Sequence, residues 1–141
     1  MPRSSFKPAP PPGLDKTSQA LWRELVTALR AEGTFREHDS TSLERYVRAV
    51  EVSRLARERI AERTKAGGDG YSTTGSTGQL VQHPDVKLAQ DSDRLAATYA
   101  DALLLSARSR AQHSIAEATD EADSLLDKDL DRTLRLLEGG R

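Results

Sequence analysis

The sequence predicts a mainly α-helical protein with one short β-hairpin between two long helices. Apolar residues recur every three or four positions along most of the chain, which is the spacing of amphipathic helices. A stretch with five glycines between Gly67 and Gly78 interrupts this pattern. Only 36% of the 141 residues are hydrophobic and 30% are charged. A chain with such a thin core commonly completes it by self-association or by binding a partner.

The bulk composition excludes several classes of protein. The chain has no cysteine, so it carries no disulfide framework and no thiolate chemistry. Its formal net charge of -1 excludes an overall basic nucleic-acid binder, but not a local basic patch. No apolar run approaches the roughly 20 residues that span a bilayer. The N-terminus lacks the apolar segment of a secretory signal, and we expect no membrane association.

Residues 1–13 are expected to be a disordered, proline-rich leader. Proline occupies positions 2, 8, 10, 11 and 12, which favours extended structure. Arg3 and Lys7 are the only charged side chains of this segment. The leader is either a solvated tail or a basic arm that contacts phosphate.

A first helix is expected over residues 15–32, with Asp15, Thr17 and Ser18 as possible N-caps and Gly33 after its end. Leu21 and Leu25 fall on one stripe, and Trp22 widens it. We interpret Trp22 as a core anchor and not as a platform for base stacking.

The second helix is expected over residues 39–65, and its apolar face turns basic halfway along. Leu43, Val47 and Val50 form an apolar stripe, and the same spacing then reaches Arg54 and Arg57. A second side of this helix carries four more arginines, which are Arg45, Arg48, Arg59 and Arg63. This side is either a solvated face on which the arginines alternate with glutamates, or a surface that faces phosphate. The candidate phosphate-binding residues are Arg45, Arg48, Arg54, Arg57, Arg59, Arg63 and Lys65, together with Arg3 and Lys7.

The glycine stretch is not a phosphate-binding loop. No lysine follows its glycines, as a P-loop requires, and a helix precedes it where a dinucleotide fold needs a strand. "YSTT" and "QLV" are β-compatible runs separated by "GSTG". The segment therefore favours a hairpin over residues 69–82, with a flexible loop as the alternative.

The third helix is expected to begin at Pro84, and its stripe contains Leu95, Tyr99 and Leu103. Alanines at positions 96, 97, 100 and 102 permit close helix approach. Ser106 lies where it can end this helix and cap the next.

Residues 115–138 are expected to form an acidic amphipathic helix. Its leucine stripe is Leu126, Leu130, Leu134 and Leu137. The stripe either packs back on the body or docks into a groove of a partner.

No enzyme and no cofactor are indicated. The three histidines are far apart in sequence, and no cysteine accompanies them as a metal ligand. No set of catalytic side chains converges, so we expect neither a catalytic nor a metal site.

The ordered pieces together resemble the small terminase subunit of tailed bacteriophages. The resemblance covers roughly residues 10–112. It rests on a leader ending in "PPPGL", on "LWRELVTALRAEG", on "FREHD" before "LERYVRAV", and on a glycine-rich insert ending in "HPDVKLAQDSDRLAATYADALLLSARSR". The helix-turn-helix that many small terminases carry is not evident, and "LLLSARSR" lacks the glycine and proline common at this point of the family.

This resemblance implies a non-catalytic protein that assembles into a homo-oligomeric ring in the host cytoplasm during virion assembly. Such a ring binds viral double-stranded DNA and recruits or regulates the large terminase subunit. On this interpretation residues 14–113 form the oligomerisation and DNA-binding core, and residues 114–141 form an acidic tail for partner docking. The alternative is a helical scaffold that binds only protein. Residues assigned to the core or to the oligomer interface are Leu21, Trp22, Leu25, Leu43, Val47, Val50, Leu95, Tyr99 and Leu103.

Overall fold

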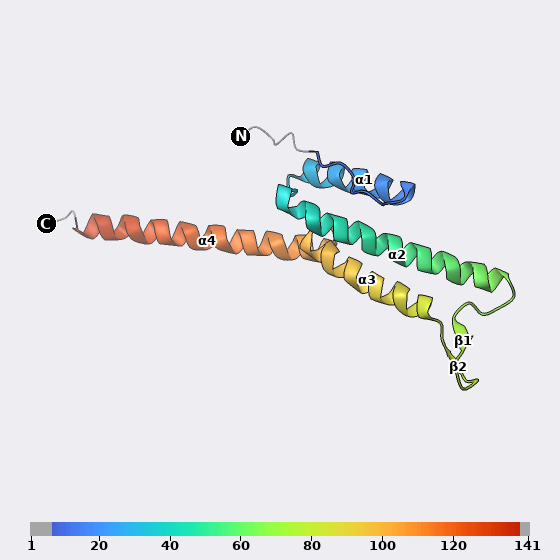
Figure 1. The fold of residues 1–141 in the computed structure, drawn as a ribbon. Coiled ribbons are helices and arrows are strands. Elements are labelled where there is room, and N and C mark those ends of the chain that lie inside the picture. Colours follow the sequence, from blue (N-terminus) through green and yellow to red (C-terminus); the bar gives the residue numbers. More distant parts are fainter. Residues whose placement is uncertain (1–6, 139–141) are drawn as a thin grey trace. The chain divides into compact units, whose positions relative to one another are not determined.

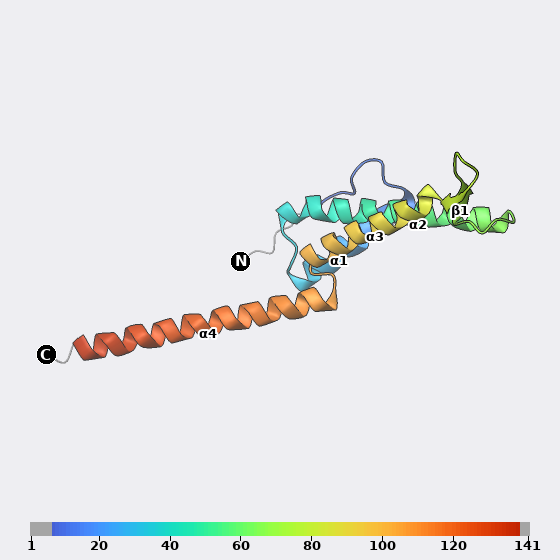
Figure 2. The ribbon, with the colours of Figure 1, turned by 90° about the horizontal axis from the view of Figure 1, so that it is seen from below.

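The computed structural model describes residues 7–138 and confirms a mainly helical chain with a hairpin between helices. The elements in order are α1 (Lys16–Glu32), the short 3-10 helix η1 (Glu37–Asp39), α2 (Ser40–Lys65), β1 (Ser72–Thr74), β2 (Leu80–Gln82), α3 (Pro84–Ala102) and α4 (Ala107–Glu138). They divide into two compact units, Met1–Leu103 and Leu104–Arg141. In the first unit α1 and α3 each pack against α2 and run antiparallel to it (Figures 1 and 2).

The N-terminal segment contacts the helices through its backbone carbonyls. The indole Nε1 of buried Trp22 donates a hydrogen bond to the Pro8 carbonyl at 3.1 Å. An Arg48 guanidinium nitrogen donates to the Pro12 carbonyl, also at 3.1 Å. Residues 7–13 therefore differ from the solvated leader expected from composition, because proline carbonyls remain available as acceptors. Residues 1–6 of the expected leader lie outside the described residues.

The core of the first unit has two parts with different side chains. Trp22 and Val26 of α1 and Leu43 and Val47 of α2 are the largest fully buried side chains. Further along α2 the buried positions follow the spacing i, i+4, i+7 and i+11 and are mostly small, and those of α3 are small as well. They are Ala49, Ser53, Ala56 and Ile60 on α2, and Ala89 and Ser92 on α3. Small residues on facing helices allow the two backbones to approach closely.

The hairpin joins α2 to α3 through a short, well-defined turn. Thr73 pairs with Val81 in the antiparallel register of β1 and β2. The Gly75 amide donates to the Gln79 carbonyl at 2.8 Å, and the Gly78 amide donates to the Gly75 carbonyl at 3.0 Å. The two strands lie within the predicted range 69–82.

The second unit consists mainly of α4, which begins earlier than the expected start at residue 115. Ser106 accepts a hydrogen bond from the Ser109 amide at 3.0 Å, so it caps α4 directly. The helix then continues without interruption to Glu138. Among the described residues, no helix is both long and apolar enough to cross a membrane.

We predict that Gly70→Ala destabilises the first unit much more than Gly78→Ala. Both glycines have positive φ angles, +74° and +82°, so either alanine costs about 1–2 kcal/mol of backbone strain. At Gly70 the added Cβ would also lie 2.6 Å from the Ile60 carbonyl oxygen and would clash with the Thr64 hydroxyl, whereas Gly78 has open space. Urea unfolding of the two variants measures the difference, and equal loss of stability would contradict the tight packing of Gly70.

Candidate functional site

Two arginines on the α1 side of α2 hold the N-terminal part of the chain. The Arg48 Nε donates to Glu44 at 2.8 Å, in addition to its bond to the Pro12 carbonyl. Arg54 forms ion pairs with Asp15, the N-cap of α1, and with Glu58 at 2.7 Å. Hydrogen bonding by Ser18, together with Arg54, lowers the pKa of the Asp15 carboxyl.

Other arginines of α2 face α3. Arg57 pairs with Asp93, whose carboxylate also accepts from the Ser53 hydroxyl. The Ser53 hydrogen bond, and Arg57 beside it, lower the pKa of Asp93. Arg45 lies over the Tyr99 ring, 6.0 Å from its centroid.

Arg63 clamps the end of α2 to the hairpin and to the start of α3. Its Nε and one terminal nitrogen donate to the Gly70 carbonyl at 3.3 and 3.1 Å, and its other terminal nitrogen pairs with Asp85 at 2.6 Å. Arg59 also reaches Asp85, at 3.3 Å. The Asp85 side chain is only 14% exposed, and the Arg63 hydrogen bond lowers its pKa.

The arginines that the sequence pattern assigns to DNA binding therefore also hold the fold. Arg57 and Arg59 keep 63% and 52% of their side chains exposed, so they can still contact a ligand while they are paired. Lys65 ends α2 and is exposed, and within the described residues it has no ion pair. Lys7 lines a shallow pocket beside Val26 of α1. Arg3 lies outside the described residues.

A basic stripe on the outer face of α1 was not predicted. Lys16, Arg23 and Arg30 follow one another at intervals of seven residues, about 10.5 Å along a helix. Lys16 and Arg23 are exposed and make no ion pair within the described part of the chain. Ala20 and Thr27 lie between these cations and are also exposed. The seven-residue spacing of these cations is the sequence signal that could have predicted the stripe. It was missed because the apolar face of the same helix is the stronger pattern.

The residues assigned to the core or the oligomer interface differ in their exposure. Those that are buried are Trp22, Leu43, Val47 and Leu103. Those of intermediate exposure are Leu21, Leu25, Val50 and Tyr99. Leu95 is 52% exposed and lies on the surface of a single chain.

The leucines of α4 are unpartnered in the second unit. Leu126, Leu130 and Leu134 are 62%, 61% and 55% exposed. With 3.6 residues per turn they lie within about 80° of one another. Asp123 and Asp127 border them on the same side of the helix. Leu137 lies in the last turns of α4, whose side chains are outside the described ones.

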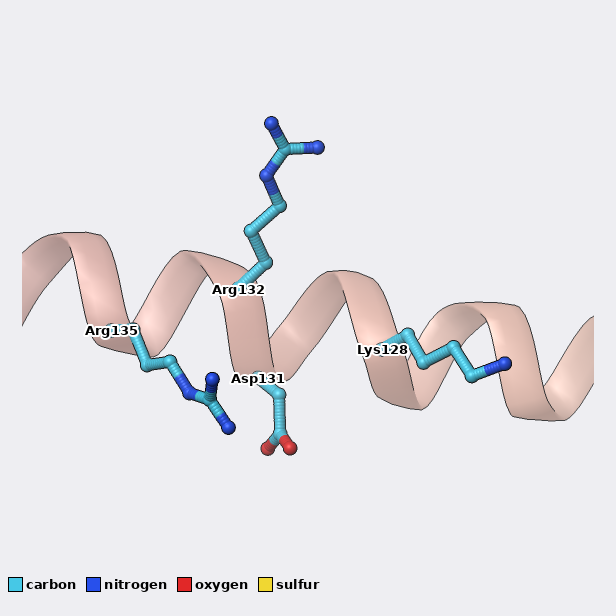
Figure 3. Close-up of a pocket in the computed structure, with 4 residues that line it drawn as sticks. All are labelled: Lys128, Asp131, Arg132 and Arg135. Atoms are coloured by element: carbon cyan, nitrogen blue, oxygen red, sulfur yellow. The ribbon is translucent and has the colours of Figure 1, made fainter.

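Three basic residues near the C-terminal end of α4 lie on the side of the helix opposite the leucines. Lys128, Arg132 and Arg135 line a shallow pocket together with Asp131 (Figure 3). The helix therefore has one apolar face with acidic borders and one mixed, mainly basic face. The first face fits an apolar groove with a basic rim on another molecule.

The described residues contain no group of three or more histidine, cysteine, aspartate or glutamate side chains that could hold a metal ion. The surface chemistry is thus that of ion pairs, exposed cations and apolar stripes. These features suit binding to charged or apolar macromolecular surfaces.

Comparison with known proteins identifies the family. The family model described as phage terminase, small subunit, matches residues 18–120. The match begins in α1, spans α2, the hairpin and α3, and ends within α4. Comparisons with curated proteins and with solved structures found no match. Because the family model covers well over half of the chain, the chain belongs to the phage terminase small subunit family.

Proposed function

We propose that the protein is a non-catalytic adaptor for DNA packaging that forms a ring, binds viral double-stranded DNA and recruits or regulates the large terminase subunit. The observation that carries this proposal is the family match over residues 18–120. Packaging by terminases takes place in the host cell, and we place the protein in the host cytoplasm during virion assembly.

Ring formation agrees with the thin core of a single chain. Leu95 on α3, Leu80 on the hairpin and Leu126, Leu130 and Leu134 on α4 are all more than half exposed. Exposed apolar surface of this kind is characteristic of interfaces with other chains. A closed ring would bury part of this surface in every subunit.

DNA binding is supported by the arrangement of cations and not by a groove-reading helix. The outer face of α1 offers Lys16 and Arg23, which are exposed. Arg59 on α2 adds an exposed guanidinium group that is already paired with a carboxylate. Contacts of this type go to phosphates and confer affinity without sequence specificity. Repetition around a ring multiplies a modest contact per subunit.

Docking to the large subunit is assigned to α4. Its apolar stripe is bordered by acids, so a basic groove is the complementary surface. Two copies of α4 facing each other through this stripe would bring Asp123 and Asp127 close to like charges. The acidic borders therefore favour a different partner over self-pairing.

The first prediction of this proposal concerns the mass of the assembled protein in solution. Native mass spectrometry of the purified chain should show one discrete oligomer whose mass is a whole multiple of 15.5 kDa. A monomer at micromolar concentration would contradict ring formation, because an interface that is functional in assembly should persist at that concentration.

The second prediction compares two pairs of basic residues in DNA binding. Lys16→Ala with Arg23→Ala should weaken binding to a DNA duplex several-fold. It should also lower the salt dependence of binding by about two units in log–log slope for each subunit that contacts the duplex, since about one counterion is released per phosphate contact. Thermal stability should change little, because both side chains are exposed and make no ion pair within the described residues.

The comparison pair for this experiment is Arg54→Ala with Arg57→Ala. These arginines bind Asp15 and Asp93, so the pair should lower thermal stability. A larger loss of DNA affinity in this pair than in the α1 pair would place the contact on α2, as the sequence pattern predicts. If the unaltered protein does not shift DNA even at low salt, the scaffold function replaces the adaptor function.

The third prediction concerns α4. Leu130→Asp should abolish co-elution with the cognate large terminase subunit, because it places a charge within the apolar stripe. Ser124→Asp adds the same charge on another face of the helix and should leave binding unchanged. Circular dichroism checks that both variants keep their helix content. Equal binding by both variants would exclude the leucine stripe as the docking surface.

A further inference from the structure

The hairpin carries an exposed and uncharged surface. We call residues 70–82 the arm. The arm contains no acidic or basic side chain, although 30% of the whole chain is charged. Leu80 is 79% exposed, Tyr71 is 58% exposed and Val81 is 36% exposed. Leu80 is therefore one of the most exposed apolar side chains of the described residues.

The base of the arm is held firmly by the helices. The Arg63 guanidinium binds the Gly70 carbonyl, and the His83 amide donates to the Tyr71 carbonyl at 2.7 Å. The Asp69 carboxylate accepts from the Tyr71 and Ser72 amides, each at 3.0 Å. A segment fixed in this way loses little conformational entropy when it docks. More of the free energy gained by burying its apolar side chains therefore remains as binding free energy.

The composition of the arm selects the kind of surface that it can contact. A phosphate-binding element needs cations, and the arm has none. Its exposed leucine, valine and tyrosine need an apolar surface instead. The charges around that surface must already be neutralised, because the arm supplies no counter-charge.

The surface of α2 has a shallow, open groove with these properties. Its apolar part comes from Val50 and Ala61, and charged side chains form its rim. The lining residues are Val50, Ser53, Arg54, Arg57, Glu58, Ala61 and Asp93. The rim arginines are paired within the chain, Arg54 with Glu58 and Arg57 with Asp93.

We propose that the arm of one copy of the chain docks into this α2 groove of a neighbouring copy. The inference deepens the proposed ring and rests on it. A neutral arm leaves the rim ion pairs intact. The α4 stripe is a poorer occupant, because its acidic borders would approach Glu58 and Asp93 of the rim.

The arm docks on a neighbour because it does not reach the Val50 end of its own groove. The groove runs along α2 from Ala61, near the arm, to Val50, which lies 15 residues before the end of α2, about 22 Å along the helix axis. The arm follows the C-terminal end of α2 (Figure 1), and there the Arg63 guanidinium binds the Gly70 carbonyl. Arm and groove are different surfaces of one chain, so their contact is heterologous. Repeated contacts of this kind close into a ring when the rotation between neighbours permits it.

Disulfide trapping in the full chain tests the proposal directly, since there is no native cysteine to interfere. Val50→Cys combined with Leu80→Cys should give, under mild oxidation, a ladder of covalent multimers on a denaturing gel that reductant abolishes. The control pair Thr27→Cys with Leu80→Cys places the second thiol on the exposed face of α1 and should give no ladder. Each single variant should give at most a trace of dimer.

Native mass spectrometry of the same samples separates this inference from the ring itself. If the native mass shows a multimer but the denaturing gel shows no covalent ladder, arm docking is overturned while the ring remains. A ladder of equal strength from the control pair would have the same meaning. Strong dimer from Leu80→Cys alone would indicate contact between two arms and would also overturn it. A monomer would refute both the ring and arm docking.

A charge placed in the arm provides a second readout. Leu80→Asp should shift the oligomer toward monomer at micromolar concentration, with an unchanged circular dichroism spectrum, because Leu80 contributes little to the fold of its own chain. Ser76→Asp places the same charge in the exposed turn of the arm, outside the apolar patch, and should leave the oligomer intact. Equal assembly of the two variants would contradict docking through Leu80.

Discussion

The close approach of α2 and α3 is the constraint on which the rest of the first unit depends. Ala56 is fully buried, and Ala89 and Ser92 are buried on the facing helix. With such small side chains between them, the helix backbones come near enough for side chains on the borders to bond across the gap. The Ser53 hydroxyl reaches Asp93 in this way, and Arg63 reaches Asp85. Those bonds in turn fix where the hairpin leaves the helices.

This packing explains why the arginines of α2 are so often paired. An arginine beside a closely packed helix meets that helix's carboxylates, and hydrogen bonding to the charged forms lowers the pKa of Asp85 and Asp93. The guanidinium suits this task because it stays charged and binds two acceptors at once, as Arg63 does with Gly70 and Asp85. Lys16 and Arg23 lie on the outer face of α1, away from α2, so they remain available for ligands. The fold thus separates cations that are ion-paired within the chain from cations that make no ion pair among the described residues.

Much of the fold could be predicted from the sequence, because the signals are local. Asp15 caps α1, Gly33 ends it, and Pro84 begins α3, as their residue types predict. The hairpin was predicted from two β-compatible runs around a glycine turn. Ser106 caps α4 as its residue type predicts, but α4 is one continuous helix and does not begin at residue 115. Residues 107–114 lack an apolar stripe, so the pattern did not join them to the helix expected over residues 115–138. The small-residue stripe of α2 was also missed, because alanine and serine do not stand out as a hydrophobic face.

The candidate site was less predictable, for a physical reason. Helix propensity, capping and turn conformation depend on residues within a few positions of one another, so the sequence by itself determined the helices, the hairpin and the leucine stripe of α4. Whether an arginine is paired depends on carboxylates far away in sequence. Arg54 meets Asp15 across 39 positions, and Arg57 meets Asp93 across 36. Only the tertiary structure brings such groups together, and it therefore decided which cations hold the fold and which cations and apolar side chains remain exposed.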